Sequence, residues 1–175
     1  MATAAGAPPA VRSKFSVKPT NFDRVLAIAS IILLTALVIA LARGRDEWGS
    51  VPTVVWAHIA TIFIAVSLTP IMMLRRRGDR LHRRLGWLWA VSLAATAILT
   101  FGIRGINQGS LSLIHILSAW TLVQVPLLVW HARRHNHAKH RAAVRGMVSG
   151  ALLIAGFFTF PFDRLMGHWL FGGIS

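Results

Sequence analysis

The sequence predicts an all-α integral membrane protein with five transmembrane helices, and three observations support this prediction. First, 55% of the 175 residues are hydrophobic and only 14% are charged. Second, the charged residues gather in short clusters between apolar runs, which are long enough to cross a bilayer as helices of about 20 residues. Third, a pattern of His and Arg occurs twice, which indicates an internal repeat of two helical hairpins.

The N-terminal part is predicted to contain a tail followed by a span. Residues 1–24 are rich in Ala, Pro and basic residues and show no apolar period, so we expect a flexible basic cytoplasmic tail. The uncharged run 25–42 is long enough to form the first span. A cleaved signal peptide is the alternative, because Ala40-Leu41-Ala42 before Arg43 resembles a cleavage site.

The remaining spans complete a transmembrane domain over residues 25–160. They are expected at about 51–74, 81–103 and 110–130, with a fifth that ends near 160, so the hairpin repeats cover about 51–103 and 110–160. The two hairpins should pack as an antiparallel four-helix bundle with the first span outside it. Residues 161–175 mix aromatic and charged residues, which predicts an interfacial C-terminal tail.

The positions of Lys and Arg predict the orientation in the membrane. Of the 19 basic residues, 15 lie in the N-terminal tail and in the turns 75–84 and 131–145, all on one predicted side. Basic loops stay in the cytoplasm, so we expect a bacterial inner-membrane protein with its N-terminus inside and its C-terminus outside. These turns should attract anionic lipid head groups. They also explain the net charge of +14 without a nucleic-acid partner.

The residue inventory excludes several kinds of site. The sequence contains no cysteine, which excludes disulfides, thiolate metal sites and iron–sulfur clusters. It has five acidic residues, none inside a predicted span, and it lacks a phosphate loop or a nucleophile elbow. The loop 131–141 holds four histidines that could ligate zinc, copper or nickel. Its arginines and lysine repel divalent cations, which favours a solvated basic loop.

Four histidines at repeated spacings, one of which is His140 of this loop, carry the functional signal. His58 and His82 are 24 residues apart, His115 and His140 are 25 apart, and the two copies are offset by 57 to 58 residues. In each hairpin the first histidine lies inside a span, while the second starts the next helix and is followed by an arginine. His58 and His115 share a predicted depth, and ionisable residues inside spans usually face the bundle interior.

Several roles for these histidines remain open. His58 and His115 could be neutral imidazoles that hydrogen-bond a neighbouring helix, paired ligands of a haem iron, or groups for proton transfer or quinol binding. His82 and His140 could be interfacial anchors or ligands of a second haem. The arginines that could neutralise haem carboxylates are Arg83, Arg141 and, at the outer level, Arg104.

The chain resembles an uncharacterised family of bacterial predicted membrane proteins, a domain of unknown function, at His58, His82-Arg83-Arg84-Leu85-Gly86, His115 and His140-Arg141. More loosely, histidines on four consecutive helices make it similar to cytochrome b561, a transmembrane electron carrier with two haems b. That resemblance implies that His58 pairs with His115 on the outer side and that His82 pairs with His140 on the inner side. The chain departs from cytochrome b561 in its shorter hairpins and in having five predicted spans rather than six.

Three functions follow from these observations. The first is a membrane-embedded di-haem cytochrome b-like electron carrier, in which the protein supplies bis-His axial ligation, burial and propionate pairing. Such a carrier would need a redox partner. The second is a non-catalytic membrane subunit or assembly factor of a larger complex, in which the histidines are structural. The third is a small transporter or proton channel that uses His58 and His115.

Overall fold

A computed structural model describes residues 18–103, 113–161 and 164–172, which form helices and turns. The all-α prediction is confirmed for these residues. The long helices are α1 (Asn21–Arg43), α2 (Thr53–Leu74), α3 (Arg80–Thr100), α4 (Leu113–Arg133) and α5 (His137–Met147). α5 continues directly through the π-helix η2 (Val148–Ile154) into the short α6 (Ala155–Phe157). The 3-10 helix η1 (Arg45–Ser50) follows α1, and α7 (Leu165–Phe171) is the last described helix.

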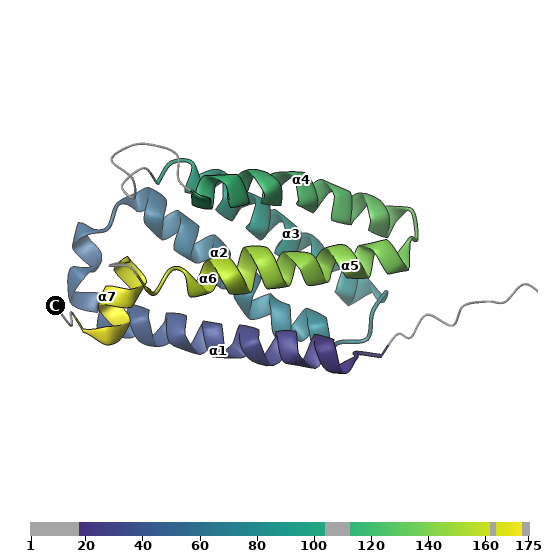
Figure 1. Ribbon diagram of the computed structural model, residues 1–175, viewed down its shortest axis with the longest axis horizontal. Coiled ribbons are helices and arrows are strands. Elements are labelled where there is room, and N and C mark those ends of the chain that lie inside the picture. Colours follow the sequence, from purple (N-terminus) through teal and green to yellow (C-terminus); the bar gives the residue numbers. More distant parts are fainter. Residues whose placement is uncertain (1–17, 104–112, 162–163, 173–175) are drawn as a thin grey trace, which may run out of the picture.

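The long helices lie side by side in one bundle (Figure 1). Each of the helices α1 to α5 packs on the next one, and η2 returns to contact α1. α1 contributes Leu26 and Ala27 to the same core as α3, α4 and α5. The expectation that the first span packs outside a four-helix bundle is therefore wrong, because α1 completes the buried interior between α2 and η2.

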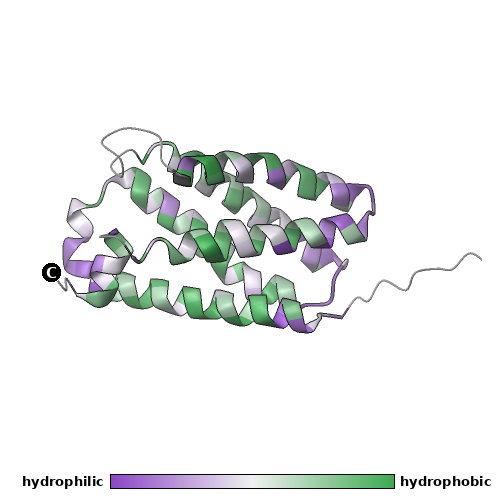
Figure 2. Cartoon of the chain, in the orientation of Figure 1, coloured by the Kyte–Doolittle hydropathy of each residue, from purple (hydrophilic) through white to green (hydrophobic). Residues whose placement is uncertain are grey.

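The outer surface of the bundle suits a membrane. Three described helices are long and apolar enough to cross one, namely Asn21–Arg43, Thr53–Leu74 and Ile114–Arg133. Large apolar side chains on these helices remain exposed, for example Ile32 at 65% and Ile116 at 67%. Figure 2 shows that hydrophobic residues cover the length of the bundle while hydrophilic residues gather at its ends. Such a distribution is favourable when lipid, not water, surrounds the helices.

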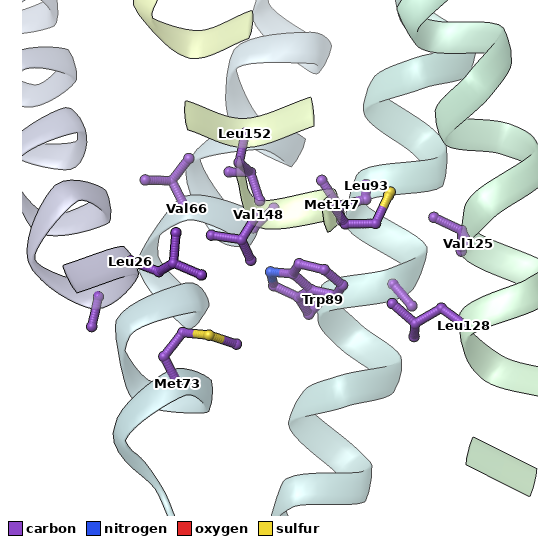
Figure 3. Close-up of a cluster of buried hydrophobic side chains, with 13 residues drawn as sticks. Leu26, Val66, Met73, Trp89, Leu93, Val125, Leu128, Met147, Val148 and Leu152 are labelled. Atoms are coloured by element: carbon purple, nitrogen blue, oxygen red, sulfur yellow. The ribbon is translucent and has the colours of Figure 1, made fainter. Parts of the chain in front are cut away.

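The main core lies around Trp89 of α3 (Figure 3). Trp89 is 4% exposed, and its indole N–H donates to the hydroxyl of Thr69 at 2.9 Å, which satisfies the polar atom of the ring. Met147, Val148 and Leu152 of the α5–η2 segment lie on one side of this ring in Figure 3. This packing joins α1 to α2, α3, α4 and the α5–η2 segment around the middle of α3.

The start of α1 is more ordered in the structure than the sequence predicted. Thr20 is the N-cap of α1, and its hydroxyl accepts a hydrogen bond from the backbone N–H of Asp23. The Asp23 carboxylate in turn accepts from the backbone N–H of Thr20 at 2.8 Å, which completes a capping box. Residues 21–24, which we assigned to the flexible tail, therefore belong to the helix.

The predicted interfacial tail, 161–175, contains α7, which docks against α1. Trp169 is 3% exposed, and its ring N–H donates to Oε2 of Glu47 at 3.1 Å. Two glycines permit close packing of this segment, Gly44 against the Trp169 ring and Gly167 against the backbone of Phe160. A Cβ at Gly44 would lie 2.0 Å from the Trp169 ring, and a Cβ at Gly167 would lie 1.6 Å from the carbonyl oxygen of Phe160. The helical part of the tail is thus fixed by packing on protein.

Candidate functional site

His58 on α2 makes its hydrogen bonds with α3. Its Nδ1 lies 3.2 Å from the carbonyl oxygen of Thr96 and 3.3 Å from the hydroxyl of Thr100. A carbonyl only accepts, and the Thr100 hydroxyl donates to the same carbonyl at 2.9 Å, so the Nδ1 of His58 must carry the ring proton. The Nε2 of the neutral ring then keeps its lone pair, which is the form that ligates a metal or accepts a proton.

A cavity of about 120 Å³ lies beside His58 in the bundle interior. Its walls are mostly apolar and come from α1 to α4, from the η2–α6 segment and from Met166 of α7. The hydroxyls on the wall each donate to the carbonyl of the residue three or four positions earlier in the chain. They therefore keep only lone pairs for a group in the cavity. These residues are Thr96, Thr100, Ser118, Thr121 and Thr159.

His115 lies in the first turn of α4 and is 4% exposed. Its ring centroid is 5.6 Å from that of Phe101, the residue that ends α3. His58 therefore approaches the end of α3 from α2, and His115 approaches it from α4. The direct pairing of the two imidazoles remains a prediction.

His140 on α5 makes a hydrogen bond similar to that of His58, although its counterpart in the sequence pattern is His82 and not His58. Its Nδ1 lies 3.1 Å from the carbonyl oxygen of Leu128 on α4, so this nitrogen carries the proton and Nε2 keeps its lone pair. In both hairpins, a histidine of one helix thus donates to a backbone carbonyl of the other helix. This match was not visible in the sequence, because it depends on side-chain direction.

His82 lies at the start of α3, at the same end of the bundle as His140. The Nδ1 of His82 is buried and has no hydrogen-bond partner, which is unusual for a buried polar atom. Its backbone N–H is satisfied, since it donates to the N-cap residue Asp79 at 2.7 Å. A hydrogen bond from Arg75 holds the pKa of the Asp79 carboxyl below its usual value.

The arginines predicted to face haem carboxylates have different environments. Arg83 is exposed and donates to the carbonyl of Gly78 at 3.1 Å. Arg141 donates to the carboxylate of Asp23 at 2.8 Å, so that part of its guanidinium is already used. Arg104 lies outside the described residues. In the histidine-rich loop, as elsewhere in the described chain, no three His, Asp or Glu side chains come together as a metal site.

Asp23 was not among the site residues predicted from the sequence. It organises the basic end of the bundle, which is the end where α1, α3 and α5 begin. Asp23 is 1% exposed and forms ion pairs with Arg77 at 2.7 Å, Arg141 at 2.8 Å and Arg145 at 2.9 Å. A signal for it did exist. It is one of only five acidic residues, and it lies in the first turn of an apolar helix on the same predicted side as both basic turns.

No family model matches the chain, and comparisons with curated proteins and with solved structures find no significant similarity. The resemblances to the bacterial membrane protein family and to cytochrome b561 therefore remain expectations. A function has to be inferred from the residues of this chain.

Proposed function

We propose that this protein is a membrane-embedded electron carrier of the cytochrome b type, with histidine pairs as axial ligands of haem iron. The observation that carries the proposal is the similar hydrogen bonding of His58 and His140, which are one histidine from each of the two proposed ligand pairs. Each ring donates Nδ1–H to a backbone carbonyl of the neighbouring helix, which leaves Nε2 as a donor atom. Ligating histidines are commonly oriented by such a hydrogen bond on the other ring nitrogen.

The histidine nitrogens suit a haem iron, but the cavity beside His58 is too small for a haem unless it widens. His82 adds a buried nitrogen without a hydrogen-bond partner near His140. The cavity beside His58 holds about 120 Å³, below the range of about 300–1,000 Å³ for small-molecule sites. A macrocycle could enter there only if the surrounding helices moved apart. The π-helix η2 supplies part of the cavity wall, and π-helical turns are frequent at functional sites.

The chemistry of one-electron transfer would belong to the haem, and the chain would control its surroundings. The carbonyls of Thr96 and Leu128 hold two of the imidazoles in one tautomer. Apolar walls around the cavity would exclude water from an outer haem. Haem at two levels of one bundle would allow an electron to cross the membrane.

The haem proposal predicts a visible spectrum. Wild-type protein purified from haem-replete cells should show a Soret band and, after reduction, an α-band. His58→Ala or His115→Ala should remove the outer haem and leave the His82/His140 site at least partly loaded. His135→Ala, a change in the exposed loop, should retain the full absorbance. Wild-type protein without a Soret band would exclude this function.

We also propose five spans in a bacterial inner membrane, with the N-terminus in the cytoplasm. The support is the gathering of basic residues at the end of the bundle where α1, α3 and α5 begin. A reporter that works only outside the cytoplasm should be active when it is fused after Ser175. A reporter that works only in the cytoplasm should be inactive at the same position. The reverse result would contradict the proposed orientation.

A structural membrane subunit is the second candidate function. The same bonds of His58 and His140 join the two helices of each hairpin, and the small cavity is consistent with a bundle that binds no macrocycle. In this case the wild type would have no haem absorbance. His58→Ala would then act only on stability, by about 0.5–1.5 kcal/mol for the lost hydrogen bond, because the Thr100 hydroxyl still donates to the Thr96 carbonyl.

A further inference from the structure

Asp23, Arg77, Arg141 and Arg145 form a charged group, the Asp23 cluster, at the basic end of the bundle. They come from α1, from the turn between α2 and α3, and from α5. The Asp23 carboxylate brings together three guanidinium groups that would otherwise repel one another. One negative charge faces three positive charges, so the cluster keeps an excess of two positive charges.

The arginines of the cluster retain donors for a further anion. A guanidinium group has five N–H donors, and Asp23 uses only some of those in the cluster. Arg77 also donates to the carbonyl of Lys18 at 3.3 Å, and Arg145 donates to the hydroxyl of Thr20 at 2.6 Å. The Nε of Arg141 is buried without a hydrogen-bond partner. The three arginine side chains are 21–27% exposed, so an anion from outside the bundle can reach them.

An apolar stripe on α1 starts beside the Asp23 cluster. The guanidinium of Arg145 lies 5.3 Å from the ring centroid of Phe22. Further along α1, Val25, Ile28 and Ile32 follow at spacings of three and four residues, which places them on one helix face. They are 59%, 58% and 65% exposed, respectively. A positively charged site and an exposed apolar stripe therefore lie next to each other.

We propose that the Asp23 cluster and the α1 stripe bind one anionic phospholipid. Its phosphate would accept hydrogen bonds from the guanidinium groups, which match phosphate geometry, and one acyl chain would lie along α1. Basic pockets between transmembrane helices are known to hold acidic head groups. The excess positive charge favours a lipid with net negative charge over a zwitterionic one, and the stripe favours a lipid over free phosphate.

Native mass spectrometry of the protein in detergent tests this site. Phosphatidylglycerol should remain bound, while phosphatidylcholine with the same acyl chains and soluble glycerol phosphate should bind more weakly. Arg77→Gln should lower the affinity for phosphatidylglycerol about fivefold, the equivalent of about 1 kcal/mol for one basic residue at an anionic lipid. Arg77 is the variant of choice because Asp23 keeps Arg141 and Arg145 as partners.

Arg84→Gln is the matched control, since it removes the same charge from an exposed position at the same end of the bundle. It should change the affinity little. Should Arg77→Gln fail to fold, Ile28→Thr tests the stripe without a change of charge and should also weaken lipid binding. Equal binding of the two lipids, or equal effects of Arg77→Gln and Arg84→Gln, would overturn the proposal. Equal binding of glycerol phosphate and phosphatidylglycerol would instead assign the cluster to a free anion.

Discussion

Asp23→Leu is expected to lower the free energy of unfolding by about 3–5 kcal/mol, the usual cost of removing one partner from a buried ionic group. The Asp23 side chain is 1% exposed and is the shared counter-charge of three arginines. Leucine would remove this counter-charge, so that three guanidinium groups would lie close together and repel one another. It would also remove the capping box of α1. Equilibrium unfolding in detergent, followed by helical circular dichroism, measures this effect.

Asp46→Leu is the matched control for this change. Asp46 is another carboxylate with an arginine neighbour, but its side chain is 92% exposed, and its distance to Arg45 is 3.7 Å. Exposed ion pairs contribute little to stability, so the transition should be almost unchanged. If Asp23→Leu and Asp46→Leu unfolded alike, the Asp23 cluster would not hold α1 to the bundle.

Gly167→Ala is expected to displace α7 from its packed position, because Gly167 lies against the backbone of Phe160 in the segment that precedes α7. A Cβ at this position would lie 1.6 Å from the carbonyl oxygen of Phe160 and 2.7 Å from its carbonyl carbon. These are backbone atoms, so no side-chain rotation can relieve the overlap. Forced overpacking typically costs about 1–3 kcal/mol, and here the short α7 should undock before the rest of the bundle changes. Trypsin cleavage after Arg164, at the start of α7, should become much faster.

Gly49→Ala provides the control for the released helix. Gly49 lies in η1, and a Cβ there would meet no atom within 4 Å. Cleavage after Arg164 should keep the wild-type rate in this variant. A wild-type rate in Gly167→Ala would contradict the close packing of α7 on Phe160.

Local features of the sequence were sufficient to predict the helices of this protein. The apolar runs placed α2, α3 and α4 within a few residues of their described bounds, because a run of apolar residues about one membrane-spanning helix long is favourable in a bilayer. The basic turns marked one end of the bundle, since arginine is costly inside lipid. The repeat also located the histidines that the structure places in the interior or at the basic end.

Only the tertiary structure decided which of these elements meet. Asp23 and Arg141 are 118 residues apart, and no local pattern connects them. The docking of α7 depends on Gly44 and Gly167, where the absence of a side chain matters only once another segment lies against it. The tautomers of His58 and His140 likewise depend on carbonyls of neighbouring helices. The sequence pattern determines helix formation and burial one segment at a time, whereas pairing depends on contacts between distant segments.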